Sequence, residues 1–441
     1  MGNQSRDRFL NILEQNKGGK KTGIYSICSA NKTVLQACLL QAREDHSILL
    51  IESTSNQVDQ YGGYTGMKPE DFMAYVNSLA RAADFPVENV LFGGDHLGPY
   101  QWRALPAAEA MARSKKLIEA YVKAGFQKIH IDTSMLCADD AADMEQNQRD
   151  ELIAGRTAEL CMVAENTWET LGDKSPRPLY VIGSEVPLPG GAQQKEEGIT
   201  PTEIPDLDRT ISNARESFRK SGLGEALSRV IAVVVQPGVE FGDDSIHPYQ
   251  RKAAEKLSRR ILDYEGMVYE AHSTDYQSEA SLRALVEDHF CILKVGPWLT
   301  FAYREGLFAL EHMEKELLGN HAGRLSGLGD TLESVMRADP GYWEPYYTGS
   351  AEEQALKRKF SFSDRARYYW PSPALIQAGK QLFMNLRENR IPLSLLSQYM
   401  PDQYMEVAAN TLENDPEALL VHKIRSVAGI YSRACGLSGA R

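Results

Sequence analysis

The stretch Val90-Leu-Phe-Gly-Gly-Asp-His-Leu-Gly98 decides how this sequence folds, because it joins a short apolar run to polar residues at its C-terminal end. Seven further runs in the first three hundred residues have the same form, and nearly all keep their polar residues at that end. They are residues 23–31, 48–57, 129–134, 179–185, 230–238, 267–274 and 291–296. Their length, their β-branched content and their Gly, Pro, Ser or Asn endings predict strands rather than buried helix segments.

Longer segments with helical spacing separate these runs, for example residues 34–42, 69–83, 106–124 and 148–170. Alternating strands and helices are typical of a parallel α/β fold, and continuous apolar runs suit strands that are covered on both faces. Eight such units have the size of a (β/α)8 TIM barrel, about 250 residues, whose active sites lie at the C-terminal strand ends. A doubly wound sheet is the competing architecture, but it places ligands mainly at one switch point. We therefore predict a TIM barrel.

The C-terminal part of the chain has a different pattern. It is charged and helical, with aromatic clusters at residues 341–347 and 365–371. We predict a barrel over residues 1–310 and a helical extension over residues 311–441, which packs on the barrel and can contribute to the active site. Pro371 and Pro373 should end any helix that precedes them.

Composition excludes several classes of protein. The 441 residues are 43% hydrophobic and 24% charged, as in an ordinary soluble enzyme. The net charge of −12 argues against nonspecific nucleic-acid binding, which needs a basic surface. No apolar run reaches about 18 residues, so we expect no membrane span. The polar N-terminus does not resemble a signal peptide, and six scattered cysteines without a CxxC pair suggest reduced thiols in a cytoplasmic protein.

Two histidines stand at the predicted catalytic rim. His96 follows Asp95 at the end of the third run, and His272 ends the seventh. A lone histidine is more often structural than a ligand, but two at one rim form a plausible metal pair. Metal sites usually add a third protein ligand, and Glu185 or Gln236 could supply it. Glu185 is preferred because a carboxylate offsets the charge of a cation; the alternatives for it are a substrate hydroxyl or an ion pair.

Other polar residues at the strand ends, Asp132, Gln236 and Lys294 among them, are candidates for binding substrate. His130 and Asp132 are two apart on the fourth run and should face the same way, with Asp132 nearer the rim. Both could instead bond a neighbouring strand. Lys294 is the only charge inside the eighth run, and a buried lysine is costly unless it is paired. It could be a Schiff-base nucleophile, a buried partner of an acid or, as we prefer, a substrate binder.

Two further segments could contact a sugar phosphate. Asn56 and Gln57 lie in an amide-rich loop after the second run, which could bind a polyol or form a structural turn. Arg365 and Arg367 precede an aromatic cluster, and arginine is the usual bidentate reader of phosphate. A solvated charged helix face is the alternative. No GxGxxG follows a predicted strand and no Walker A motif occurs, so we expect no nucleotide cofactor.

Five motifs resemble a known family: residues 52–66, 92–99, 130–135, 183–187 and 363–370. They are similar to the so-called non-catalytic subunit of class II D-tagatose-1,6-bisphosphate aldolase, also labelled tagatose-6-phosphate kinase. Some members of that family are tagatose-6-phosphate 4-epimerases. The resemblance implies a TIM barrel related to class II aldolases and a role in galactitol, tagatose or amino-sugar catabolism.

The resemblance also implies residue roles. The Asp-His pair of class II aldolases looks like Asp95-His96, with His96 as a metal ligand and Asp95 as the acid/base. Their late-strand metal histidine looks like His272. Their remaining metal histidine is missing, because the sixth run offers Gln236 instead. This pattern is compatible with a shell of His96, His272 and Glu185, where Glu185 would also be catalytic, or with no metal.

Chemistry then separates the functions that the resemblance implies. A 4-epimerase that acts by retro-aldol cleavage needs a divalent metal such as Zn²⁺, Mn²⁺ or Co²⁺, a base and a phosphate grip. We therefore expect metal-dependent epimerisation of D-tagatose 6-phosphate to D-fructose 6-phosphate, with a phosphorylated ketohexose as substrate. The alternatives are a non-catalytic subunit that stabilises a catalytic class II aldolase, and aldolase activity itself.

Overall fold

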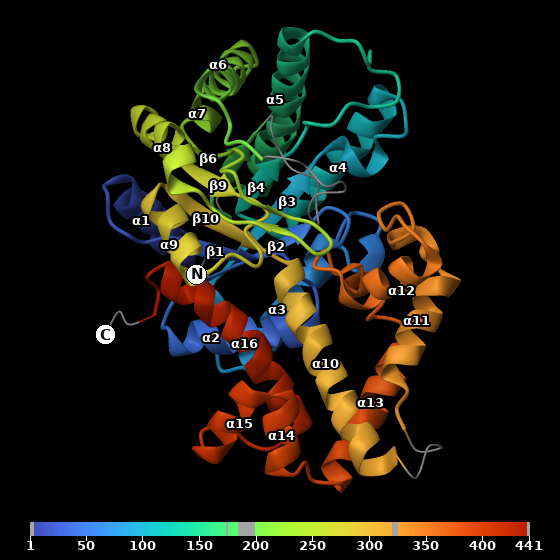
Figure 1. The fold of residues 1–441 in the computed structure, drawn as a ribbon. Helices are drawn as coiled ribbons and strands as arrows, with labels where there is room; N and C mark the ends of the chain where they lie inside the picture. Colours follow the sequence, from blue (N-terminus) through green and yellow to red (C-terminus); the bar gives the residue numbers. More distant parts are fainter. Residues whose placement is uncertain (1–3, 173–174, 184–198, 320–324, 439–441) are drawn as a thin grey trace.

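The computed structural model describes residues 4–172, 175–183, 199–319 and 325–438 and contains a closed barrel of eight parallel strands (Figure 1). The strand order is β1-β10-β9-β6-β5-β4-β3-β2. The strands are β1 (Ile24–Ile27), β2 (Leu49–Thr54), β3 (Val90–Leu97), β4 (Lys128–Ile131), β5 (Leu179–Ile182), β6 (Val230–Val234), β9 (Val268–Ala271) and β10 (Phe290–Val295). Each of the eight predicted runs forms one of them, so the TIM barrel is confirmed.

Helices follow the strands and surround the barrel, beginning with α1 before the first strand. They are α1 (Gln4–Lys17), α2 (Lys32–Glu44), α3 (Pro69–Ala82), α4 (Ala107–Ala124), α5 (Gln146–Leu171), α6 (Ile204–Lys220), α7 (Gly224–Leu227), α8 (Arg251–Arg260) and α9 (Glu279–Glu287). Short 3-10 turns are η1 (Gly63–Thr65), η2 (Val87–Asn89), η3 (Pro99–Trp102) and η5 (Ile261–Asp263), and β7 (Glu240–Phe241) pairs antiparallel with β8 (Ile246–His247).

Local sequence explains where the helices begin and end. The side chain of Asn31 accepts hydrogen bonds from the backbone N–H groups of Thr33 and Val34, at 3.0 and 3.1 Å, and so caps α2. Gly125 ends α4 with φ of 99°, a left-handed conformation that glycine adopts without a Cβ clash.

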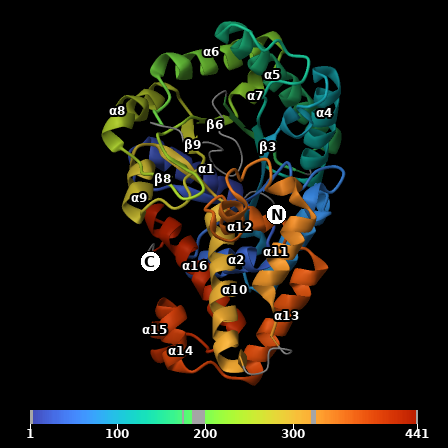
Figure 2. The ribbon, with the colours of Figure 1, turned by 45° about the vertical axis from the view of Figure 1, so that its right-hand side comes forward.

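The C-terminal extension is helical, as predicted, and begins without a break from the barrel. It contains α10 (Pro297–Leu318), α11 (Leu328–Ala338), η7 (Pro340–Tyr342), α12 (Ala351–Phe360), η8 (Arg365–Tyr368), α13 (Pro373–Glu388), α14 (Leu393–Tyr399), α15 (Pro401–Ala408) and α16 (Pro416–Ala434). Figure 2 shows α10 running from the barrel into this group of helices. Because α10 passes through residue 310, the division into two domains there stays a prediction.

Pro371 and Pro373 lie where the sequence predicts a helix end. The 3-10 turn η8 stops at Tyr368, and Pro373 is the first residue of α13. Proline is favoured at a first helical position because its missing N–H would have no partner there.

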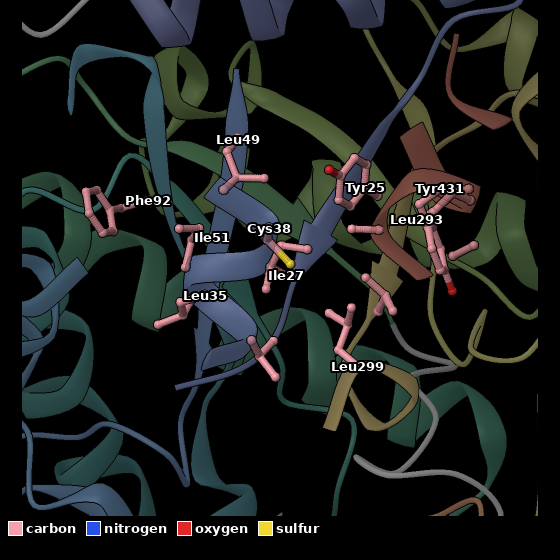
Figure 3. Close-up of a cluster of buried hydrophobic side chains, with 14 of the residues drawn as sticks. Tyr25, Ile27, Leu35, Cys38, Leu49, Ile51, Phe92, Leu293, Leu299 and Tyr431 are labelled. Carbon is pink, nitrogen blue, oxygen red and sulfur yellow. The ribbon is translucent and has the colours of Figure 1, made fainter. Parts of the chain in front are cut away.

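The last helix of the chain closes the ring of helices around the barrel. Strand β10 lies between β9 and β1, and α16 contacts both α9 and α2, the helices that follow those two strands. Figure 3 shows the buried cluster beneath it, with Leu35 and Cys38 of α2 near Ile27, and Tyr25 of β1 near Tyr431 of α16. The position over β10 is therefore filled by a helix from the far end of the sequence.

Candidate functional site

A cavity lies at the C-terminal ends of the barrel strands and also receives residues of the extension. Several predicted site residues line it, from β3, β10 and η8 and from the segments that directly follow β2 and β9. They are Asn56, Gln57, Asp95, His96, His272, Lys294 and Arg367. The extension therefore contributes a side chain to this cavity.

A β-bulge explains how two consecutive residues of β3 reach the same interior. The register between β3 and β4 shifts between Gly94 and Leu97, and His96 has φ of 51°. Neighbouring strand residues normally point to opposite faces, but a bulge re-aims them. The absence of a side chain at Gly93 also matters, because a Cβ there would lie 2.7 Å from Cγ of Glu52. The bulge therefore turns both Asp95 and His96 toward the interior of the barrel.

Three imidazole rings meet inside the barrel. The ring centroids of His96 and His130 are 5.1 Å apart, those of His96 and His272 are 5.0 Å apart, and those of His130 and His272 are 5.3 Å apart. All three side chains are buried. The sequence placed His96 and His272 at one rim, and the structure adds His130 from β4 as a third, equidistant ring.

Each ring also contacts a carboxylate. Nδ1 of His96 lies 2.8 Å from Asp132, Nδ1 of His130 lies 3.1 Å from Asp95, and Nε2 of His272 lies 3.1 Å from Glu270. Histidines that bind metals usually donate their other ring N–H to a carboxylate, which fixes the tautomer and leaves one lone pair for the metal. The His96 and His272 pairs have this form, whereas Nδ1 of His130 also lies 3.2 Å from the backbone N–H of His96, which can only donate to it.

The site meets two tests for a divalent metal. Nε2 of His130 is buried and has no hydrogen-bond partner in the described part of the chain. With metal–nitrogen distances of about 2.0–2.1 Å and tetrahedral angles, the centroids of three imidazole ligands lie roughly 5.2 Å apart, close to the spacing here.

Charge gives a third test. The buried cluster has four carboxylates and two ammonium groups, so negative charge is in excess, which favours a cation. These groups are Glu52, Asp95, Asp132, Glu270, Lys128 and Lys294. The residues present therefore fit a divalent metal.

Donor atoms of Asp95, His130, Glu270 and His272 lie mutually within 4.8 Å and form a second possible ligand set, which includes two of the three imidazoles but not His96. Lys294 lies 2.6 Å from Asp95, and Lys128 lies 2.7 Å from Glu270. These two carboxylates are therefore already engaged by cations and by ring nitrogens, which leaves His130 and His272 as the better donors of this set.

A lysine–carboxylate network supports the rings from below. Lys128 lies 2.6 Å from Glu52 and 2.7 Å from Glu270, and none of these three side chains is exposed. Lys294 bonds Glu52 and Asp95. Breaking a buried pair of this kind strongly destabilises a protein, because it leaves an uncompensated charge. The network therefore fixes the floor of the site.

Burial and neighbouring charges set the protonation of these groups. Burial lowers the pKa of His272 to about 3, so its ring is neutral and can bind a metal. Burial alone would raise the pKa of Asp95, but His96 and Lys294 hold it well below its usual range. Burial would likewise lower the pKa of Lys294, but Asp95 and other anions raise it well above its usual value. Lys294 is therefore cationic, which does not suit a Schiff-base nucleophile.

The two predicted arginines separate. Arg367 lines the cavity, whereas Arg365 donates from Nε to the carbonyl of Tyr342 and lies with its guanidinium 3.2 Å from the ring centroid of Tyr346. Arg365 does not line the cavity with Arg367.

Gln236 and Asp132 have local partners. The side-chain oxygen of Gln236 accepts from the backbone N–H groups of Gly238 and Val239, at 2.8 and 3.0 Å, and so closes a turn. Asp132 orients His96 and also accepts from Ser134. Neither residue lines the cavity. Glu185 lies outside the described residues, as does most of the loop after β5.

Comparison with known proteins places this site in a family. A sequence profile described as "D-tagatose-1,6-bisphosphate aldolase subunit GatZ/KbaZ-like" matches residues 9–436. The chain belongs to this family. A crystal structure of a probable tagatose 6 phosphate kinase from Sinorhizobium meliloti 1021 is 43% identical, with a TM-score of 0.84, and the match covers 94% of this chain and 100% of that one. The resemblance seen in the sequence is confirmed.

Two more distant structures are aldolases. Fructose-bisphosphate aldolase from Campylobacter jejuni is 12% identical over 86% of this chain and 91% of that one, with a TM-score of 0.43. The YdjI aldolase from Escherichia coli K12 is 12% identical over 84% of this chain and 98% of that one, with a TM-score of 0.38. Membership of the GatZ/KbaZ-like family itself indicates sugar-phosphate metabolism in the context of tagatose-bisphosphate aldolase.

Sequence reasoning missed several residues that build the site in this GatZ/KbaZ-like protein. Glu52, Lys128 and Glu270 each place a charge inside or at the start of a buried strand. That is the signal that singled out Lys294, and it would have found them. His130 was noticed with Asp132 but not assigned as a ligand. Within the described ranges, no helix is long and apolar enough to cross a membrane.

Proposed function

We propose that this protein is a metal-dependent ketose-phosphate 4-epimerase that interconverts D-tagatose 6-phosphate and D-fructose 6-phosphate. The observation that carries the proposal is the set of three buried histidines, each paired with a carboxylate, beside a cavity that also contains Arg367. A divalent cation such as Zn²⁺, Mn²⁺ or Co²⁺ would be held by His96, His130 and His272 and would supply Lewis-acid stabilisation of negative charge on the ketose oxygens.

The position of the reacting carbon favours cleavage and rejoining of a C–C bond. The C4 hydrogen of a 2-ketose is not α to the carbonyl, so simple deprotonation does not epimerise it. Removing the proton of the C4 hydroxyl instead lets the C3–C4 bond break, which gives an aldehyde and a three-carbon enediolate. Rotation of the aldehyde and re-addition then invert C4.

Asp95 is suited to take the C4 hydroxyl proton. It lines the cavity, it is ionised, and Lys294 and Thr54 hold its two oxygens at 2.6 and 3.1 Å. Lys294 also lines the cavity, so it can bind a substrate oxygen while it orients Asp95. These contacts fix the geometry of proton transfer before substrate enters.

Arg367 is suited to grip the phosphate. Nη1 donates to the carbonyls of Ser363 and Asp364, and Nη2 donates to the hydroxyl of Tyr368 at 2.9 Å. Of the five guanidinium donors, this leaves Nε–H and one Nη2–H, which share one edge and can bind a phosphate through two oxygens. Asn56 and Gln57 line the same cavity and would bind sugar hydroxyls.

A second candidate function is that of a non-catalytic subunit that binds and stabilises a catalytic class II aldolase. The family description as an aldolase subunit favours it. Kinase activity is not proposed, because the sequence has no glycine-rich loop to hold nucleotide phosphates.

One assay separates these functions. Purified protein with Mn²⁺, Co²⁺ or Zn²⁺ would receive tagatose 6-phosphate, and formation of fructose 6-phosphate would be followed. We expect turnover by the wild type, loss of turnover in His96→Ala, and wild-type turnover in His312→Ala, whose ring stacks on Tyr399 in the extension. Absence of product with every metal, together with stabilisation of a co-expressed aldolase, would favour the subunit function.

A further inference from the structure

Tyr368 lines the cavity beside Arg367, on the side formed by the extension. Asp95 lines the same cavity from strand β3 of the barrel. Both side chains are buried, and both carry a group that can exchange a proton. The cavity therefore has such groups from two different parts of the fold.

The hydroxyl of Tyr368 is held so that its hydrogen is free for a ligand. Arg367 donates to the hydroxyl oxygen at 2.9 Å, and arginine has donors only. A side-chain hydrogen bond with Asn56 also lowers the pKa of Tyr368. Arg367 cannot accept the phenolic hydrogen, which a substrate oxygen in the cavity can then accept.

The surroundings keep the ring in place and favour loss of its proton. Tyr342 stacks on Tyr368 at 4.9 Å with an interplanar angle of 10°, and Tyr64 meets it edge-on at 4.9 Å. Burial alone would raise the pKa of Tyr368, but Arg367 and Arg365 lower it below its usual value. Tyr368 is therefore rigid and is a stronger acid than an exposed tyrosine.

Inversion at C4 creates a need for two such groups. In the two epimers the C4 oxygen projects to opposite sides of the carbon chain. When C1–C3 and the phosphate are held, one fixed side chain can align with the oxygen of only one epimer. The other epimer needs a proton donor or acceptor on the second side.

We propose that Tyr368 is this second proton-transfer residue, serving the C4 oxygen of one epimer while Asp95 serves the other. This inference rests on the proposed epimerase function. It adds a residue to which the proposed function gives no role.

The number of protons on enzyme and substrate is unchanged over the reaction. In one direction Asp95 takes the C4 hydroxyl proton, the C3–C4 electron pair moves to the three-carbon enediolate, and C4 becomes an aldehyde. After rotation the enediolate attacks the other face, and Tyr368 donates its proton to the new C4 oxygen. The proton then passes from Asp95 to the phenolate through solvent. The reverse direction uses the same steps backwards.

The test is Tyr368→Phe, which removes one oxygen. Epimer formation and release of glyceraldehyde 3-phosphate would be measured with tagatose 6-phosphate and, separately, with fructose 6-phosphate. We expect kcat/KM for epimerisation to fall about 100-fold or more, equally in both directions, as for loss of a general acid or base. The variant should still cleave one of the two epimers and release glyceraldehyde 3-phosphate. It should no longer cleave the other epimer.

Tyr342→Phe is the matched control, because it removes a hydroxyl from the ring that stacks on Tyr368. Tyr342 does not line the cavity, so this variant should leave epimerisation and cleavage unchanged. Unchanged epimerisation in Tyr368→Phe would overturn the inference and leave the epimerase function intact. Equal loss of cleavage from both epimers would show a structural role and also overturn it. A wild type that neither epimerises nor releases triose would overturn both proposals.

Discussion

At the scale of single residues, His96 shows how local strain builds the site. Its φ of 51° is rare for a residue with a side chain and costs on the order of 1 kcal/mol. The bond from its Nδ1 to Asp132 and the packing of the other two rings offset this cost. Two glycines before a polar pair at a strand end can be recognised in a sequence. The bulge that turns both polar residues inward cannot, because it depends on the register with the next strand.

His130 tests the metal proposal at this scale. His130→Ala should weaken binding of Co²⁺ or Zn²⁺ more than about 100-fold, since even changes beside a ligand cost 10–100-fold in metal affinity. Metal content after dialysis, and cobalt absorption bands, would measure the loss without any activity assay. His289→Ala, which changes a histidine outside the cavity, is the control. Full metal retention in His130→Ala would contradict both ligand sets, because each of them contains His130.

Asp275 should give stability a distinct pH dependence. Burial raises its pKa to about 6, although the backbone N–H groups of Trp298 and Gly296 oppose the rise. Because the pKa of Asp275 is higher in the folded than in the unfolded protein, its protonated carboxyl stabilises the folded state below about pH 4. This stabilisation is lost as the pH rises through about 6. Relative to Asp275→Asn, the wild type should lose about 2–3 kcal/mol of unfolding free energy between about pH 4 and 7. Urea unfolding at several pH values would measure this, and parallel curves for the two proteins would refute it.

At the scale of elements, the sequence predicted all eight strands because each carries its own apolar pattern and polar ending. It predicted much of the cavity lining for the same reason, since polar residues at strand ends gather at one rim. It could not separate Arg365 from Arg367, two residues apart in η8. Their different directions follow from tertiary contacts, with Arg365 drawn onto Tyr346 and Arg367 held by the hydroxyl of Tyr368.

The turn η8 should therefore recognise phosphate through one arginine. Arg367→Ala should raise KM for tagatose 6-phosphate roughly 10- to 100-fold, the effect of losing a charge-assisted hydrogen bond of about 1.5–3 kcal/mol. Activity on unphosphorylated tagatose should not fall by this factor. Steady-state kinetics with both sugars would separate phosphate binding from general damage.

Arg365→Ala is the comparison for that prediction. It should lower the melting temperature, because it removes a buried guanidinium that packs on Tyr346, yet leave the ratio of KM values for the two sugars unchanged. Equal loss of phosphate discrimination in both variants would restore the expectation from sequence that both arginines grip the phosphate.

At the scale of the whole molecule, barrel and extension should unfold together. Tyr431 of α16 is fully buried, its hydroxyl donates to the carbonyl of Thr274 at 2.8 Å, and its ring lies 5.9 Å from that of Tyr25. Tyr431→Ala should lower the unfolding free energy by about 3–5 kcal/mol, and Tyr431→Phe by about 1–3 kcal/mol. Denaturant titrations followed by tryptophan fluorescence and circular dichroism should give one coincident transition for each protein.

The exposed Tyr61 provides the control for that series, because Tyr61→Ala should change stability by no more than about 0.5 kcal/mol. A variant of Tyr431 that unfolds in two separate steps would show that α16 is not part of the cooperative unit of the barrel. This closure could not be predicted from the sequence, because nothing in the pattern of α16 says which strand it covers.

The late arrival of α16 has a consequence for how the protein is made. On a ribosome that adds roughly 5–20 residues per second, the roughly 140 residues between the end of β10 and the end of α16 take about 7–28 seconds to appear. Throughout that interval the nascent barrel has all its strands but no cover over the apolar surface formed by Leu35 and Cys38. That surface is where a chaperone would bind a growing chain, and where a stalled chain would aggregate.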